Sequence, residues 1–150
     1  MTPFLVATLV AHVIIGVCAI ACTHLVFMHL IRRAPSFSYL SKVSFACFIL
    51  FLVSWASGAY YYVVYYGKSV KPVIVGGAYP WAHTFFMEGK EHVFLILPFL
   101  ALLLWLAVKL LARVPDGGLK NAAAMLAFVA LLIGVFVAAS GILISGAVRQ

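Results

Sequence analysis

The stretch "HVFLILPFLALLLWLAV", residues 92–108, contains no acidic, lysine or arginine side chain and decides the fold of this chain. About 20 consecutive apolar residues in a helix cross the ~30 Å hydrocarbon layer of a bilayer. Three further runs share this character, at residues 1–31, 43–67 and 121–148. We therefore expect an all-α integral membrane protein built as a four-transmembrane-helix bundle.

The composition supports this expectation. Hydrophobic residues make up 67% of the chain and charged residues 9%, which is too little polar surface for a water-soluble domain of this size. The first run is longer than the apolar core of a cleaved signal peptide and has no charge before it, so we interpret it as a retained span. We predict a single membrane domain over residues 1–150, with helices at about 4–31, 43–66, 88–113 and 121–147 and an outer loop at about 67–87.

The basic residues lie at the ends of the apolar runs. Their position indicates membrane topology and pairing with lipid head groups rather than binding to nucleic acid. The first and third loops carry most of them, and cytoplasmic loops are usually the richer in Lys and Arg. We therefore expect a multi-pass protein of a prokaryotic cytoplasmic membrane with both termini outside. The residues of these two loops are Arg32, Arg33, Lys42, Lys109, Arg113 and Lys120, whereas Lys68, Lys71, Lys90 and Arg149 lie on the predicted outer side.

The two halves of the chain resemble each other. When residues 12–36 are laid over residues 92–116, His12 falls on His92, and an Arg and a Pro further along also coincide. With a small additional shift, "ASG" at 56–58 overlies "ASG" at 139–141. These matches predict two repeated helical hairpins related by an axis along the membrane normal, as parallel repeats are.

Polar residues gather near one end of the predicted bundle. The stretch "FFMEGKEHVF", residues 85–94, holds Glu88 and Glu91, two of the three acidic residues, directly before His92 and the apolar run. His12 lies inside the first run on a face of small residues that includes Gly16. Counting helix rise from the basic ends of the spans places His12, His92 and Tyr61 at a similar depth near the outer edge of the hydrocarbon. Ionisable residues at such depths usually face the bundle interior and mark function.

Two equivalent histidines on facing helices, with small residues beside them, form the arrangement that a bis-histidine haem needs. The first hypothesis is therefore a small membrane electron-transfer protein within a larger redox complex. It would bind one b-type haem near the outer face through His12 and His92, with Gly16 and Tyr61 beside the cofactor. The general plan resembles that of small membrane b-type cytochromes and of the core of copper-resistance membrane proteins.

The same residues suit other chemistry. His12, His92, Glu88 and Glu91 could bind a divalent metal or copper through imidazole nitrogen and carboxylate oxygen. A histidine, a carboxylate and tyrosines at the membrane edge could instead bind a quinone and take up its protons.

A further alternative needs no cofactor: a structural or accessory subunit of a respiratory or photosynthetic membrane complex. In every case the expected partners are the lipid bilayer and other membrane subunits, without nucleic acid. The sequence has no Ser-His-Asp set, phosphate-binding loop or redox cysteine pair, so we expect no catalytic activity of its own.

Overall fold

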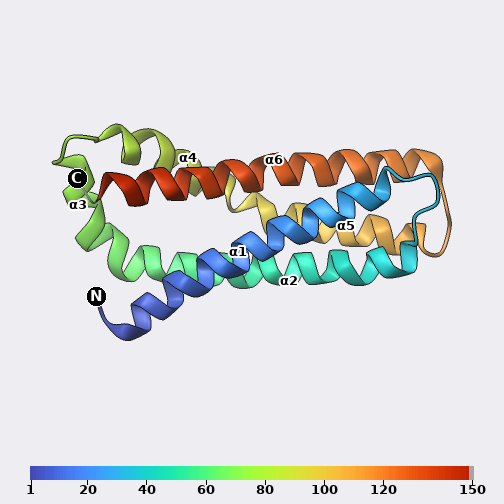
Figure 1. Ribbon diagram of the computed structural model, residues 1–150, viewed down its shortest axis with the longest axis horizontal. Helices are drawn as coiled ribbons and strands as arrows, with labels where there is room; N and C mark the ends of the chain where they lie inside the picture. The colour runs from blue at the N-terminus through green and yellow to red at the C-terminus, as the bar shows by residue number, and fades with distance from the viewer. Residues whose placement is uncertain (149–150) are drawn as a thin grey trace.

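The computed structural model describes residues 1–148, and the regular structure within them is helical (Figure 1). Arg149, counted above among the basic residues of the outer side, lies outside the described residues. The elements in chain order are α1 Pro3–Leu30, α2 Phe37–Tyr61, the π-helix η1 Tyr62–Val70, α3 Lys71–Val75, the π-helix η2 Ala82–Met87, α4 Glu88–Val93, α5 Ile96–Leu111 and α6 Gly117–Ala147.

These elements join into four stretches that are long and apolar enough to cross a membrane. The prediction of four such helices is confirmed. The outward surface of every stretch carries large apolar side chains, among them Phe4, Val63, Phe99 and Ile142. The four stretches are Pro3–Leu30, Phe37–Val75, Ala82–Leu111 and Gly117–Ala147.

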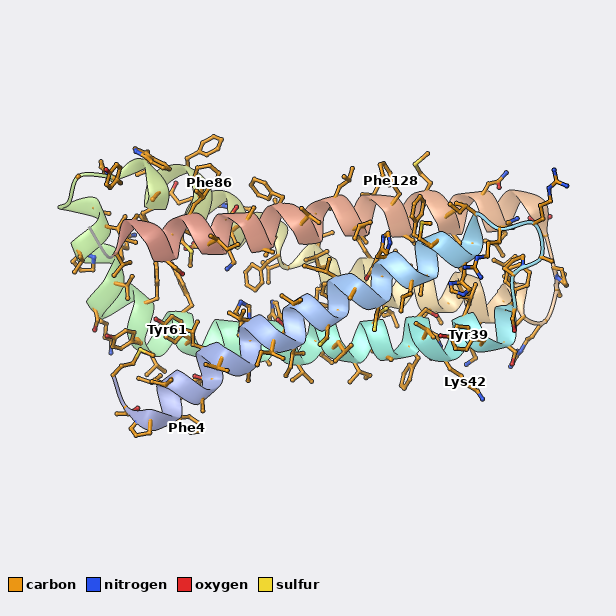
Figure 2. The ribbon with its side chains drawn as sticks, in the orientation of Figure 1. Phe4, Tyr39, Lys42, Tyr61, Phe86 and Phe128 are labelled. Atoms are coloured by element: carbon orange, nitrogen blue, oxygen red, sulfur yellow. The ribbon has the colours of Figure 1, made fainter. Side chains whose placement is uncertain are left out.

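The bundle has two unlike ends (Figure 1). The short connections between α1 and α2 and between α5 and α6 lie at one end, which we call the loop end. The start of α1 and the end of α6 lie at the other end, together with η1, α3 and η2. We call residues 62–87 the cap and this end the cap end. Figure 2 shows Tyr61 and Phe86 near the cap end and Tyr39 and Lys42 near the loop end.

Three apolar clusters lie along the bundle. Alanines in them let the backbones of neighbouring helices approach closely, which is how membrane helices gain packing energy. The loop-end cluster draws on all four stretches, whereas the buried residues of the cap cluster come from the cap and α6 and include a tyrosine. The loop-end cluster contains Val26, Leu30, Leu40, Cys47, Leu104, Val108, Leu111, Ala123 and Ala127; the middle one Ala19, Phe51, Leu97, Ala101 and Ala130; and the cap cluster Tyr66, Ile74, Ala82, Met87 and Ile144.

The loop end is fixed by local hydrogen bonds. Asp116 precedes the first turn of α6, and its Oδ1 accepts a bond from the Leu119 backbone N–H at 2.6 Å, which caps the helix. The Lys120 ammonium donates to the Arg32 carbonyl at 2.8 Å and so ties the start of α6 to the connection between α1 and α2.

The predicted outer loop at 67–87 is wrong in large part, because η1, α3 and η2 make most of it helical. Pro72 lies in the first turn of α3, where its missing N–H needs no acceptor, so it does not end the helix. The turn comes later, at Gly76, whose N–H donates to the Pro72 carbonyl at 3.0 Å. The second stretch therefore runs on to Val75.

Two other predicted boundaries differ from the structure. α2 begins at Phe37 rather than near residue 43, so that Lys42 lies inside the helix. The third stretch begins at Ala82 but is interrupted at Phe94 and Leu95. Pro98 explains this break: it has no N–H to give the Phe94 carbonyl, which accepts from Leu97 at 3.3 Å instead.

Candidate functional site

His12 joins α1 to α2. Its Nδ1 lies 2.7 Å from the Ser54 carbonyl oxygen, and the Ser54 hydroxyl donates to the His12 carbonyl at 3.0 Å. The imidazole rests on Gly58, where a Cβ would stand 2.6 Å from ring atoms, and a Cβ at Gly16 would stand 3.0 Å from the Ser54 Oγ. The space beside Gly58 and Gly16 is thus filled by the side chains of His12 and Ser54, which belong to the same helical hairpin.

His92 and Glu88 lie on the exposed side of α4. The His92 Nδ1 donates to the Glu88 carbonyl oxygen of its own helix at 2.7 Å. Because α4 packs against η2, α5 and α6, while His12 packs against α2, the two predicted haem ligands lie in separate environments. Tyr61 pairs with Tyr65 at a ring-centroid distance of 5.6 Å.

Lys90 points from α4 into the bundle. Its Nζ lies against Gly141, where a Cβ would be 3.4 Å away. In the aligned halves Gly141 corresponds to Gly58, on which His12 rests. A different side chain therefore packs against each glycine, His12 against Gly58 and Lys90 against Gly141. Lys90 lies where the repeat predicts His92.

The cap contains a buried pair that the sequence did not reveal. His83 on η2 is 2% exposed and Tyr66 on η1 is 3% exposed. The Tyr66 hydroxyl and the His83 Nδ1 share a hydrogen bond of 3.0 Å, while the His83 Nε2 is buried without a hydrogen-bond partner. One ring nitrogen of this histidine is therefore available to a further group.

A second pair lies beside the first. Tyr62 stacks on Tyr66 with ring centroids 5.3 Å apart and planes inclined by 22°, and its phenol lies beside the Glu91 carboxylate. The Glu91 Oε1 is buried without a partner. We call the residues Tyr62, Tyr66, His83 and Glu91 the polar seam. It runs where η1 faces η2 and α4, with Tyr66 opposite His83 and Tyr62 opposite Glu91.

The π-helix explains why sequence reasoning missed the seam. In an α-helix the inward stripe through Ser54 and Gly58 continues to Tyr61 and Tyr65. A π-helix has i→i+5 bonds and more residues per turn, which changes the face that points inward. Tyr62 and Tyr66 therefore lie nearly above each other. Tyr66 is the buried member of the tyrosine run. Its partner His83 was also missed, because residues 67–87 were predicted to form a loop.

The seam offers hydrogen bonds and exchangeable protons rather than a ready metal site. Within residues 1–148, no three His, Cys, Asp or Glu side chains come together in a group that could hold a metal ion. The set His12, His92, Glu88 and Glu91 does not form one, because Glu88 and His92 face outward while His12 packs on α2.

Comparison of the chain with protein-family models, curated proteins and solved structures finds no match.

Proposed function

We propose that this chain is a multi-pass protein of a prokaryotic cytoplasmic membrane, with the cap and both termini outside. The large exposed apolar side chains support it: Val63, Phe99 and Ile142 are 69%, 67% and 74% exposed. Large apolar side chains exposed to this degree on several helices are costly in water and match lipid chains. The excess of basic residues at the loop end favours a cytoplasmic position for that end.

We further propose that the chain is a small electron-transfer subunit of a larger redox complex that binds the head group of a quinone at the polar seam. The observation that carries this proposal is that the His83 Nε2 and the Glu91 Oε1 are both buried without partners. Leaving such a group unpartnered costs about 1–3 kcal/mol, so a ligand that supplies the missing bonds is favoured. A quinol hydroxyl donates to the Glu91 Oε1, and an oxygen of the quinol or the quinone accepts from the His83 Nε2–H.

The residues of the seam also suit the protons of this chemistry. Oxidation of a quinol releases two protons and two electrons. An imidazole nitrogen and a carboxylate oxygen are both proton acceptors, and the two tyrosine hydroxyls extend the hydrogen-bonding groups along the cap. In this proposal the electrons pass to a metal centre in a partner subunit, and the seam binds and orients the head group.

The test is binding of a quinol without a tail, kept reduced, to the purified protein in detergent, followed by the shift in melting temperature. We expect saturable stabilisation, with the affinity lowered about tenfold in Glu91→Gln and His83→Gln. The matched controls are Glu88→Gln and His92→Gln, which change exposed side chains and should bind like the wild type. Absence of saturable binding, or equal binding by all four variants, would refute a quinone site at the seam.

The haem hypothesis remains a second candidate because of one observation. The Nδ1 atoms of His12 and His92 are each 2.7 Å from a backbone carbonyl oxygen. Such bonds fix the tautomer and leave Nε2 free to bind iron or copper. A shared haem would require α4 to turn, so that His92 replaces Lys90 beside Gly141.

A reduced-minus-oxidised absorption spectrum, with iron and copper analysis on the same sample, tests this candidate. Sharp α and Soret bands that disappear in His12→Ala and His92→Ala would support it. His29→Ala is the matched control, because the His29 Nδ1 also bonds a carbonyl, that of Leu25, at 2.9 Å near the loop end. A protein that binds neither haem, metal nor quinone would leave the role of a cofactor-free accessory subunit.

A further inference from the structure

A groove of about 220 Å³ lies between α2 and α5. Every residue along it is apolar or aromatic. The lining residues of α2 are spaced by about one helical turn and so share one face of that helix. Those of the facing segment, which begins at Leu95, have a similar spacing. The lining residues are Phe48, Leu52, Trp55, Leu95, Pro98, Phe99 and Leu102.

The groove leads toward the polar seam. Trp55 and Tyr62 lie two turns apart on the same face of the second stretch, because seven residues return a helix to nearly the same direction. On the facing stretch Leu95 follows Glu91 by one turn. The apolar groove and the polar pairs therefore follow one line along the facing sides of the second and third stretches.

All the buried polar side-chain atoms without a hydrogen-bond partner within residues 1–148 lie along these facing sides of the second and third stretches. They are the Trp55 Nε1, the His83 Nε2 and the Glu91 Oε1. Trp55 stacks on Phe94 at 6.5 Å, beside the break in the helix. Such atoms are especially costly in hydrocarbon, where no water can replace the missing bond. Their alignment points to a ligand that is apolar along the groove and polar at the seam.

We propose that the ligand is an isoprenoid quinone, with its ring at His83 and Glu91 and its tail lying past Trp55 in the groove between α2 and α5. This inference rests on the proposed function and adds the class of the ligand and its route of entry. Because the groove is on the outside of the bundle, the tail enters sideways from the lipid. The Glu91 carboxylate disfavours a phospholipid phosphate, whereas a quinone head is neutral.

The experiment uses Trp55 as reporter. The chain has three tryptophans, so Trp81→Phe with Trp105→Phe leaves Trp55 alone. Quinones quench tryptophan fluorescence, and quenching is titrated in lipid nanodiscs with a tail-free quinone and with an isoprenoid-tailed one. Leu52→Phe with Leu102→Phe fills the groove. The matched control, Leu103→Phe with Leu106→Phe, adds the same rings at positions that are 53% and 47% exposed and line no part of it.

We expect the filled groove to weaken saturable quenching by the tailed quinone at least tenfold and to leave the tail-free quinone and the control variant unchanged. Equal quenching by the tailed quinone in filled and control variants would overturn the groove as the tail site while leaving the seam intact. Displacement of the tailed quinone by a phospholipid of equal chain length would also overturn it. Loss of saturable quenching by both quinones in the unfilled protein would overturn the seam and the groove together.

Discussion

The contact around His12 and the polar seam are both polar regions of an apolar bundle, yet they differ in one respect. At His12, the Nδ1 and the carbonyl are both bonded to Ser54, and the ring rests on Gly58. At the seam, each pair leaves an atom without a partner, on His83 and on Glu91.

This difference separates two uses of a polar group in an apolar helix. A histidine whose bonds are made within the protein helps to join helices and gains about 0.6 kcal/mol per interhelical bond. A buried atom without a partner lowers the stability of the protein alone. The first arrangement favours packing, and the second favours a ligand. Mutations at the two regions should therefore change stability in opposite directions.

The largest effect is expected at Gly58. Gly58→Ala places a methyl group 2.6 Å from the His12 ring, which must move and lose its bond to Ser54. We expect a loss of about 1–3 kcal/mol in the free energy of unfolding, measured by reversible unfolding in mixed micelles. Gly146→Ala is the control, since nothing lies within 4 Å of its added Cβ. Equal stability of the two variants would contradict the packing described at His12.

The next effect is expected at Ser54. Ser54→Ala removes the hydroxyl that donates to the His12 carbonyl across the helices, at a cost of about 1 kcal/mol in the same measurement. Ser57→Ala is the matched control, because its hydroxyl bonds only carbonyls of its own helix. The combination of His12→Ala with Ser54→Ala should cost less than the sum of the single changes. Additive costs would show that the two side chains act independently.

A smaller effect of opposite sign is expected at the groove. Trp55→Phe removes an unpartnered N–H and keeps an aromatic ring, so the ligand-free protein should gain up to about 1 kcal/mol. Trp105→Phe should instead lose about 0.5 kcal/mol, because the Lys109 ammonium lies 4.7 Å from the Trp105 ring centroid. Melting curves of both variants, without added quinone, check the signs. Destabilisation of Trp55→Phe would indicate that its N–H has a partner.

The smallest effect is expected at His92. This side chain is exposed and bonds only its own helix, so His92→Ala should change the free energy of unfolding by less than about 0.5 kcal/mol. His12→Ala, by comparison, should cost about 0.5–2 kcal/mol in the same unfolding experiment. Similar losses for both would mean that His92 makes a contact equivalent to that of His12.

The apolar runs were sufficient to predict the four long helices, because length and hydrophobicity alone set them. The packing face of α1 at His12 and Gly16 follows from regular α-helical spacing, and the structure places both residues against α2. The cap could not be predicted in this way. Pro72 and the two following glycines are typical of a loop, and the sequence has no signal for a π-helix.

That change in helix type decides the seam. It buries Tyr66, while Tyr61, Tyr62 and Tyr65 are half-buried, and it gives His83 a position on a helix. The break at Phe94 and Leu95, which Pro98 causes, precedes α5, and Lys90 rather than His92 lies beside Gly141. The sequence thus indicated the correct end of the bundle for Glu91, while the partners around it depended on backbone geometry that residue spacing does not encode.

A quinone at the polar seam is tested by extraction of lipid-soluble molecules from protein purified out of its own membrane, with an absorption spectrum of the same sample. We expect near-stoichiometric quinone in the wild type and in Glu88→Gln, and its loss in Glu91→Gln. Equal background quinone in all three proteins, together with α and Soret bands, would contradict the quinone site and favour a haem at His12 and His92.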